Sequence, residues 1–290
     1  MKFVEPKVIL LADTRLDSRG ISDLLDALGI PEWVTDATSP SESLIEIAGR
    51  MCYRSFAPGL NPNVTKIREG NQPYINNILA SRHGSVLEHA YVTFAFLDVS
   101  RVFTHEVVRH RLCAFSQESL RYVRLTQLSV YRPDAFSKES LLSYLQQLFE
   151  KPSGSDDAEN LEETIEKLAT DMARTLTEAT NSLFSQCEKM QLDLSIMLGL
   201  DNTHDFGHKK KLTSALRRLV PMGITTNILV TTNHRNWRHL IALRTDPAAE
   251  EEIRKIFREV AEQLQARFLN IYQDMKKQEN GSFTFAHGRV

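Results

Sequence analysis

The chain has 290 residues, of which 42% are hydrophobic and 25% charged, and its formal net charge is −2. This composition is typical of a soluble globular protein, and the small net charge argues against nucleic-acid binding through bulk charge alone. No run of about 18 apolar residues is present, so we expect no membrane-spanning helix. Residues 1–6 hold an acid and a proline where a signal peptide needs its apolar stretch, and the three cysteines form no Cys-x-x-Cys pair. Together these features predict a reduced, cytoplasmic protein.

In the N-terminal half, short apolar runs alternate with capping and turn residues. The stretch Ser39 to Glu42 supplies capping residues for a helix, and Asp98 with Ser100 can cap another. A β-branched and aromatic run before Asp98 is typical of a buried strand. In chain order we predict a strand over 8–12, a helix over 41–51, a loop over 54–63, a strand over 90–97 and a helix over 101–111.

The C-terminal half is rich in helical periodicity. Pro133, Pro152 and Gly154 punctuate residues 133–160, which we predict to be a surface insertion. Beyond it we predict helices over 161–190 and 209–219, a strand over 224–232, a short helix over 235–243 and a long helix over 247–277. No repeat and no domain boundary is evident. The pattern therefore predicts an α+β protein, a single mixed domain with long helices around a small sheet.

The residues with the most chemical character follow the helix predicted over 101–111. Arg109, His110 and Arg111 are consecutive, and a serine-rich stretch leads from them to Arg121 and Tyr122. Guanidinium groups bind phosphates and planar anions through two parallel hydrogen bonds, so this cluster suits a nucleotide or dinucleotide. A solvated basic surface at a helix C-terminus is the alternative, because cations also complement the helix dipole there.

A zinc site is not expected in this segment. His105 and Glu106 begin a sequence that resembles His-Glu-x-x-His, but the second histidine, His110, comes one residue too late. Residues at i and i+5 lie roughly 140° apart around a helix, whereas zinc ligands need one face. We therefore predict no metal.

The motif itself resembles a known family. Arg109-His110-Arg111, seven residues and then Ser119 match the Arg-His-Arg-(x)7-Ser signature of flavin-dependent thymidylate synthases. Residues 82–89 are similar to the family's segment that contains histidine and glutamate and precedes its strand. Residues 217–221, 231–235, 239 and 243–244 resemble the C-terminal block of the family. The resemblance runs from about residue 44 to 254. The N-terminal extension, residues 1–40, and the segment 133–160 lie outside it.

The resemblance implies a fold and an activity. It implies the flavin-dependent thymidylate synthase fold for a single catalytic domain over 1–290, and an enzyme that methylates C5 of dUMP to give dTMP. Methylenetetrahydrofolate would give the carbon and FAD, reduced by NADPH, the hydride. It also implies a homotetramer whose active sites combine residues of different subunits.

Roles for individual residues follow from the same resemblance. The residues implied to bind FAD are Ser85, Arg109, His110, Arg111, Gln117, Asn233, His234, Arg235 and His239. Those implied to bind dUMP are Glu106, Arg109, Gln117, Glu118, Ser119, Leu120, Arg121, Arg217 and Arg244. Arg244 would favour the N3-deprotonated, electron-rich uracil, and Ser119 would orient the nucleotide. No general base adjoins Ser119 in the sequence, so we do not assign it as a nucleophile.

Three departures and three alternatives remain. Gln117 puts an amide where many members carry a carboxylate, Ala114 replaces a hydroxyl residue, and His239 stands where some members have asparagine. A C5-methylase of UMP or another uridine nucleotide is one alternative, and a non-catalytic nucleotide-binding protein is a second. The third, a nucleic-acid-binding protein using Arg121, Arg124 and Arg132, is disfavoured by the negative net charge.

Overall fold

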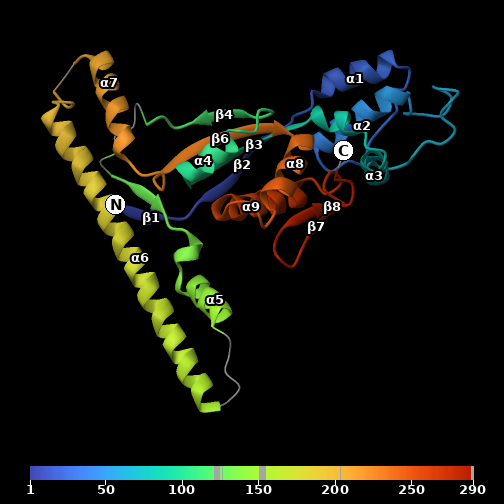
Figure 1. Ribbon diagram of the computed structural model, residues 1–290. Coiled ribbons are helices and arrows are strands. Elements are labelled where there is room, and N and C mark those ends of the chain that lie inside the picture. The colour runs from blue at the N-terminus through green and yellow to red at the C-terminus, as the bar shows by residue number, and fades with distance from the viewer. Residues whose placement is uncertain (121–124, 126, 150–154, 203, 289–290) are drawn as a thin grey trace. The chain divides into compact units, whose positions relative to one another are not determined.

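The computed structural model describes residues 1–120, 125, 127–149, 155–202 and 204–288, with side chains from residue 160 in the helix that begins at 155 (Figure 1). Contacts divide the chain into two compact units. Unit 1 comprises residues 1–6, 97–107 and 117–228, and unit 2 comprises residues 7–96, 108–116 and 229–290. None of the described helices carries the long, uncharged apolar stretch that a bilayer crossing requires.

Strands and helices are interspersed along the described chain, singly or in short runs of one kind. The first half contains β1 (Lys2–Val4), β2 (Lys7–Asp13), α1 (Ser18–Ala27), α2 (Pro40–Tyr53), α3 (Asn71–Ala80), the 3₁₀ helix η1 (Gly84–Glu88), β3 (Tyr91–Ser100), α4 (Arg101–Val107), β4 (Ala114–Gln117) and β5 (Ser129–Tyr131). The second half contains η2 (Asp134–Phe136), α5 (Lys138–Leu148), α6 (Ser155–Met197), α7 (Phe206–Leu216), η3 (Arg217–Leu219), β6 (Thr225–Asn233), α8 (His234–Arg244), α9 (Glu251–Arg267), β7 (Met275–Lys277) and β8 (Phe283–Phe285).

The sheets are small. The largest has four strands in the order β2-β3-β6-β4, and β3 and β6 are its long central members, which contribute residues to both units. In unit 2 the hydroxyls of Thr93 on β3 and Thr231 on β6 lie 2.8 Å apart across the sheet. Strand β1 pairs in parallel with β5 in unit 1, and β7 pairs antiparallel with β8 in unit 2.

In unit 2 the core is built on the aromatic side chains of β3. Phe94 and Phe96 stack on each other, and Trp237 of α8 meets Phe94 edge to face at a centroid distance of 5.1 Å. The indole nitrogen of Trp237 donates to the Val92 carbonyl at 3.2 Å, which satisfies its one polar group. Helix α9 adds Phe257 to this cluster and packs on β2. Burial of these large rings fixes α8, and with it the side chains that α8 carries, on the sheet.

In unit 1 the long helix α6 organises two apolar clusters. Its N-terminal half packs against α5 through Leu141, Leu145, Ile165 and Ala169, and the two helices lie side by side (Figure 1). Its C-terminal half packs against the chain around β5. The predicted insertion, 133–160, contains η2 and α5, and its residues 150–154 lie outside the described part. That this segment is an insertion stays a prediction.

Most predicted elements are present with shifted ends. Strands β2, β3 and β6 and helices α2, α6, α7 and α8 lie where expected, and Ser39 caps α2 by accepting from the Glu42 amide at 3.2 Å. Ser100 likewise caps α4, accepting from Phe103 N at 3.1 Å. Asp98 does not cap; it lies inside β3.

Two helix ends were predicted wrongly. Helix α4 ends at Val107 rather than near 111, so Arg109 to Arg111 lie in a turn. Helix α9 ends at Arg267 rather than near 277. Phe268, Ile271, Tyr272 and Met275 continue the helical spacing of buried apolar residues, but they do so through tight turns that lead into β7. Periodicity alone cannot separate these two ways of burying the same residues.

Candidate active site

The Arg-His-Arg motif lies in the turn between α4 and β4, in the part of unit 2 that spans residues 108–116. Arg109 and Arg111 are exposed and His110 is half-buried. The Nε of Arg244, at the end of α8, donates a hydrogen bond of 2.9 Å to Nε2 of His110. The turn and α8 thus bring together two residues to which the resemblance gives separate roles: His110 is implied to bind FAD, and Arg244 is implied to lie beside the uracil.

His110 is neutral at physiological pH. Burial, then the charge of Arg244 and the nearby His239, lower the pKa of His110 to about 4. Because the Nε of an arginine can only donate, Nε2 of His110 is the acceptor and its proton lies on Nδ1. The arrangement gives Arg244 a fixed orientation without placing a second full positive charge beside it.

A cavity of about 380 Å³ opens next to the N-terminus of α8 in unit 2. Three predicted FAD residues, Asn233, Arg235 and His239, line it. Asn233 also caps α8 by accepting from Asn236 N at 2.9 Å, and Arg235 forms an ion pair with Glu88. The remaining lining residues are Glu88, Leu112, Asn236, Arg238, Phe285 and Gly288. Ser85 is exposed on η1, three residues before Glu88.

His234 does not present its ring to this cavity, and its contact with the flavin stays a prediction. Its side chain is 0% exposed, its Nδ1 lies 3.0 Å from the Tyr272 hydroxyl, and Phe268 packs edge-on against it. Burial, then the charge of Arg238, lower the pKa of His234 to about 3. The structure gives this ring a role in the core of unit 2.

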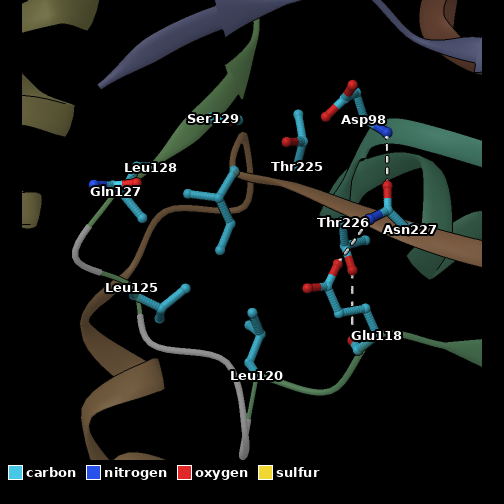
Figure 2. A pocket seen from close by; sticks show the side chains of 11 residues that line it. Asp98, Glu118, Leu120, Leu125, Gln127, Leu128, Ser129, Thr225, Thr226 and Asn227 are labelled. Carbon is cyan, nitrogen blue, oxygen red and sulfur yellow. Dashed lines mark hydrogen bonds between the residues drawn. The ribbon is translucent and has the colours of Figure 1, made fainter.

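The predicted nucleotide segment, residues 117–120, lies in unit 1 beside a smaller pocket of about 200 Å³ (Figure 2). Glu118 and Leu120 line this pocket, together with Asp98, Leu125, Gln127, Leu128, Ser129, Ile224, Thr225, Thr226 and Asn227. Ser119 is half-buried. The side-chain nitrogen of Gln117 is buried without a hydrogen-bond partner among the described residues.

Two arginines of unit 1 lie close enough to affect each other. Arg101, at the start of α4, is half-buried and its Nη2 donates to the Glu118 carbonyl at 3.4 Å. Burial lowers the pKa of Arg101; Glu118 opposes this effect, and the charge of Arg217 in η3 adds to it. The Nε of Arg101 is buried without a partner in the described part of the chain. A bound anion would stabilise these two guanidinium groups, because one is half-buried and their positive charges repel each other.

Arg101 is a residue that the sequence reasoning missed. Its position, directly after a strand and next to the cap Ser100, is a signal that could have drawn attention to it. Of the other predicted residues, Glu106 is half-buried on α4 and Arg217 is exposed. Arg121, with Arg124, lies outside the described residues. The predicted set is thus divided between unit 1 (106, 117–120, 217) and unit 2 (85, 109–111, 233–235, 239, 244).

The fold and the sites define a mixed α+β protein whose guanidinium, imidazole and amide groups suit phosphorylated, planar ligands. A family model described as thymidylate synthase complementing protein matches residues 34–268. The flavin-dependent thymidylate synthase of Mycobacterium tuberculosis (strain ATCC 25618 / H37Rv) is 32% identical over 255 residues, covering 88% of this chain and 87% of that protein. The enzyme of the same name from Mycolicibacterium gilvum (strain PYR-GCK) is 33% identical over 246 residues, covering 84% and 83%.

A solved structure supports the fold. The UMP/dUMP methylase PolB from Streptomyces cacaoi, bound with 5-Br dUMP, superposes with a TM-score of 0.56 over 94% of this chain and 96% of that one, at 17% identity. This likeness confirms the predicted mixed fold. By the extent of the family match, the chain belongs to the thymidylate synthase complementing protein family.

Proposed function

We propose that this chain is a flavin-dependent thymidylate synthase that methylates C5 of dUMP and yields dTMP. The observation that carries the proposal is 32% identity over 88% of the chain with an enzyme of that name. The Arg244–His110 hydrogen bond supports it, because it joins two residues that the signature and the C-terminal block contribute separately.

The residues of unit 2 fit FAD. A dinucleotide needs cations for its pyrophosphate and neutral, planar or amide groups for its rings. Exposed Arg109 and Arg111 supply the cations, and the neutral ring of His110 with Asn233 and His239 supplies the other contacts. FAD, when bound, supplies the hydride that completes the new methyl group. NADPH as its reductant and methylenetetrahydrofolate as carbon donor are parts of the same proposal.

The residues of unit 1 fit a nucleotide monophosphate. The buried amide nitrogen of Gln117, which has no hydrogen-bond partner among the described residues, suits an acceptor atom of the ligand. Arg101 and Arg217 suit a phosphate, because an anion offsets both the burial of Arg101 and its repulsion by Arg217, which lower the pKa of Arg101. Ser119 and Leu120 complete this set among the described residues, and a contact from Arg121 is part of the same proposal.

Arg244 acts on the base. Uracil resists attack by electrophiles at C5 until electron density is moved there, and a fixed cation near N3 favours its deprotonated, electron-rich form. The hydrogen bond to His110 uses the Nε edge of Arg244 and holds the plane of the guanidinium. A neutral His110 keeps Arg244 as the cation of this pair. Ser119 orients the nucleotide by hydrogen bonding.

The assembly and location are also proposals. We infer a homotetramer with active sites that combine residues of different subunits, acting in the cytoplasm, from the same family resemblance. Incubation of the purified protein with dUMP or UMP, each with methylenetetrahydrofolate, NADPH and FAD, tests the function by product analysis. Formation of dTMP supports it. Methylation of UMP in preference to dUMP would favour the other C5-methylase, and bound nucleotide without product would indicate a non-catalytic protein.

A further inference from the structure

The side chain of Asn227, on β6, joins two segments of unit 1 that are far apart in the sequence (Figure 2). Its Nδ2 donates to Oε2 of Glu118 at 3.0 Å, and its Oδ1 accepts from the backbone amide of Asp98 at 3.0 Å. Its backbone carbonyl accepts from the Glu118 amide at 2.9 Å. One asparagine therefore contacts Glu118 twice and Asp98 once.

The contact with Asp98 orients the Asn227 amide. Asp98 has φ of +57° although it is not glycine, a conformation that a surrounding structure must hold in place. In this conformation its N–H points to Asn227 Oδ1. Because an N–H can only donate, Oδ1 faces Asp98 and Nδ2 is left to face the Glu118 carboxylate. Only a side chain with an acceptor on one side and a donor on the other satisfies both neighbours.

The backbone amide, the backbone carbonyl and the carboxylate of Glu118 each make a hydrogen bond. Besides the two contacts with Asn227, its carbonyl accepts from Thr226 Oγ1 and from Arg101 Nη2, both at 3.4 Å. Glu118 lies within residues 117–120. Before it comes Gln117, whose buried donor has no partner in the described part of the chain, and after it comes Leu120, which lines the pocket. Fixing Glu118 therefore fixes the backbone from which these neighbours project.

We propose that Asn227 is a positioning residue for nucleotide binding, which sets residues 117–120 through Glu118 and is itself set by the amide of Asp98. The inference rests on the proposed function for the identity of the nucleotide. It assigns Asn227 no contact with the substrate. We expect its effect on the KM for the nucleotide rather than on FAD binding. Every contact that carries it lies in unit 1, and Gln117, the one residue of 117–120 also implied to bind FAD, takes part in none of these contacts.

The test is an exchange of polarity between Asn227 and Glu118. In Asn227→Asp the new carboxylate still accepts from Asp98 N but faces the Glu118 carboxylate, and like charges at this separation repel. In Glu118→Gln the amide oxygen still accepts from Asn227 Nδ2. In the variant that carries both substitutions, the new amide at position 118 donates to the new carboxylate at position 227, and the contact is restored in the opposite direction. Asn63→Asp, in an exposed loop of unit 2, is the control for one added charge.

We expect Asn227→Asp to raise the KM for dUMP about tenfold or more, the range for one lost charge-assisted hydrogen bond, with kcat and FAD affinity near those of the unmodified protein. Asn63→Asp should change KM little. Glu118→Gln alone is the reference for the lost carboxylate, and the double variant should return KM from the Asn227→Asp value to that reference. An unchanged KM in Asn227→Asp overturns the inference. So does a combined loss of kcat, FAD binding and thermal stability in Asn227→Asp that the double variant does not rescue. If the unmodified protein makes no dTMP, the proposed function fails, and dUMP affinity by calorimetry on the same four variants decides the positioning role.

Discussion

Arg244 and His110 are 134 positions apart in the sequence, yet the Nε of Arg244 donates to Nε2 of His110 at 2.9 Å. The bond is possible because Trp237 and its aromatic neighbours fix α8 on β3, which places the last turn of the helix beside the motif turn within unit 2. Burial keeps His110 neutral, so the imidazole accepts and the positive charge stays on the arginine. In the proposed enzyme this pair links the flavin residues to the cation that acts on uracil.

Arg244→Lys tests whether this cation has a chemical or a structural role. A lysine keeps the charge at the end of α8 but loses both the Nε–H donor to His110 and the planar fork. We expect a folded protein that binds FAD and forms dTMP at a greatly reduced kcat. Arg267→Lys, in the last turn of α9, is the matched control for a helix-end cation and should leave turnover unchanged. Near-normal turnover in Arg244→Lys would assign Arg244 to helix stabilisation.

Arg109 and Arg111 are expected to hold FAD. Both are exposed, and charge-assisted hydrogen bonds are worth about 1.5–3 kcal/mol each, so Arg109→Ala with Arg111→Ala should weaken FAD binding by orders of magnitude. The measurement is the flavin absorbance that remains after gel filtration. Arg19→Ala with Arg174→Ala removes two exposed cations elsewhere and should retain the flavin. Stoichiometric FAD in the motif variant would refute the assignment.

Stability should fall on acidification because two histidines are neutral in the folded state. The pKa of His110 is lowered to about 4 and that of His234 to about 3, from 6.5. Below pH 6.5 the unfolded chain therefore binds more protons than the folded one, and the free energy of unfolding decreases as the pH drops toward 4. Denaturant titrations from about pH 7 to about pH 4 measure the slope.

His234→Gln should reduce this slope, because it removes the more deeply buried of the two rings, whereas His208→Gln, on the exposed side of α7, should leave it unchanged. Equal slopes in all three proteins would show that other groups cause the acid response.

Shared active sites predict complementation between inactive chains. Ser119 belongs to unit 1 and Arg244 to unit 2, so Ser119→Ala and Arg244→Ala inactivate different parts of the proposed site. If subunits contribute these residues to one another, mixed oligomers should regain activity that neither parent has. Sedimentation of the unmodified protein as a fully active monomer would contradict the shared-site proposal.

The parts of the fold with strong local signals were predictable from the sequence. The aromatic, β-branched run before Asp98 forms β3, and Ser39 and Ser100 cap α2 and α4. The end of α9 was not, because Phe268 to Met275 keep a helical spacing of buried residues through successive turns. Short strands such as β7 and β8 derive their stability from pairing with each other, which no local pattern records.

The site residues that belong to a sequence motif were predictable. The contacts that depend on how the helices and strands pack were not. The resemblance implicated His110 and Arg244 but not their hydrogen bond, because bond partners depend on how α8 packs. It also placed His234 at the flavin but gave no sign that Tyr272 and Phe268, which are separated from it by more than 30 residues, enclose its ring. Asn227 and Arg101 carry no motif; only their contacts with Glu118 give them a role.

The most direct test of the account is a product assay on the purified protein with dUMP, methylenetetrahydrofolate, NADPH and FAD, using [5-³H]dUMP to follow the C5 proton. The proposed enzyme releases tritium and forms dTMP only when both FAD and NADPH are present. Bound flavin with no tritium release and no dTMP under these conditions would contradict it.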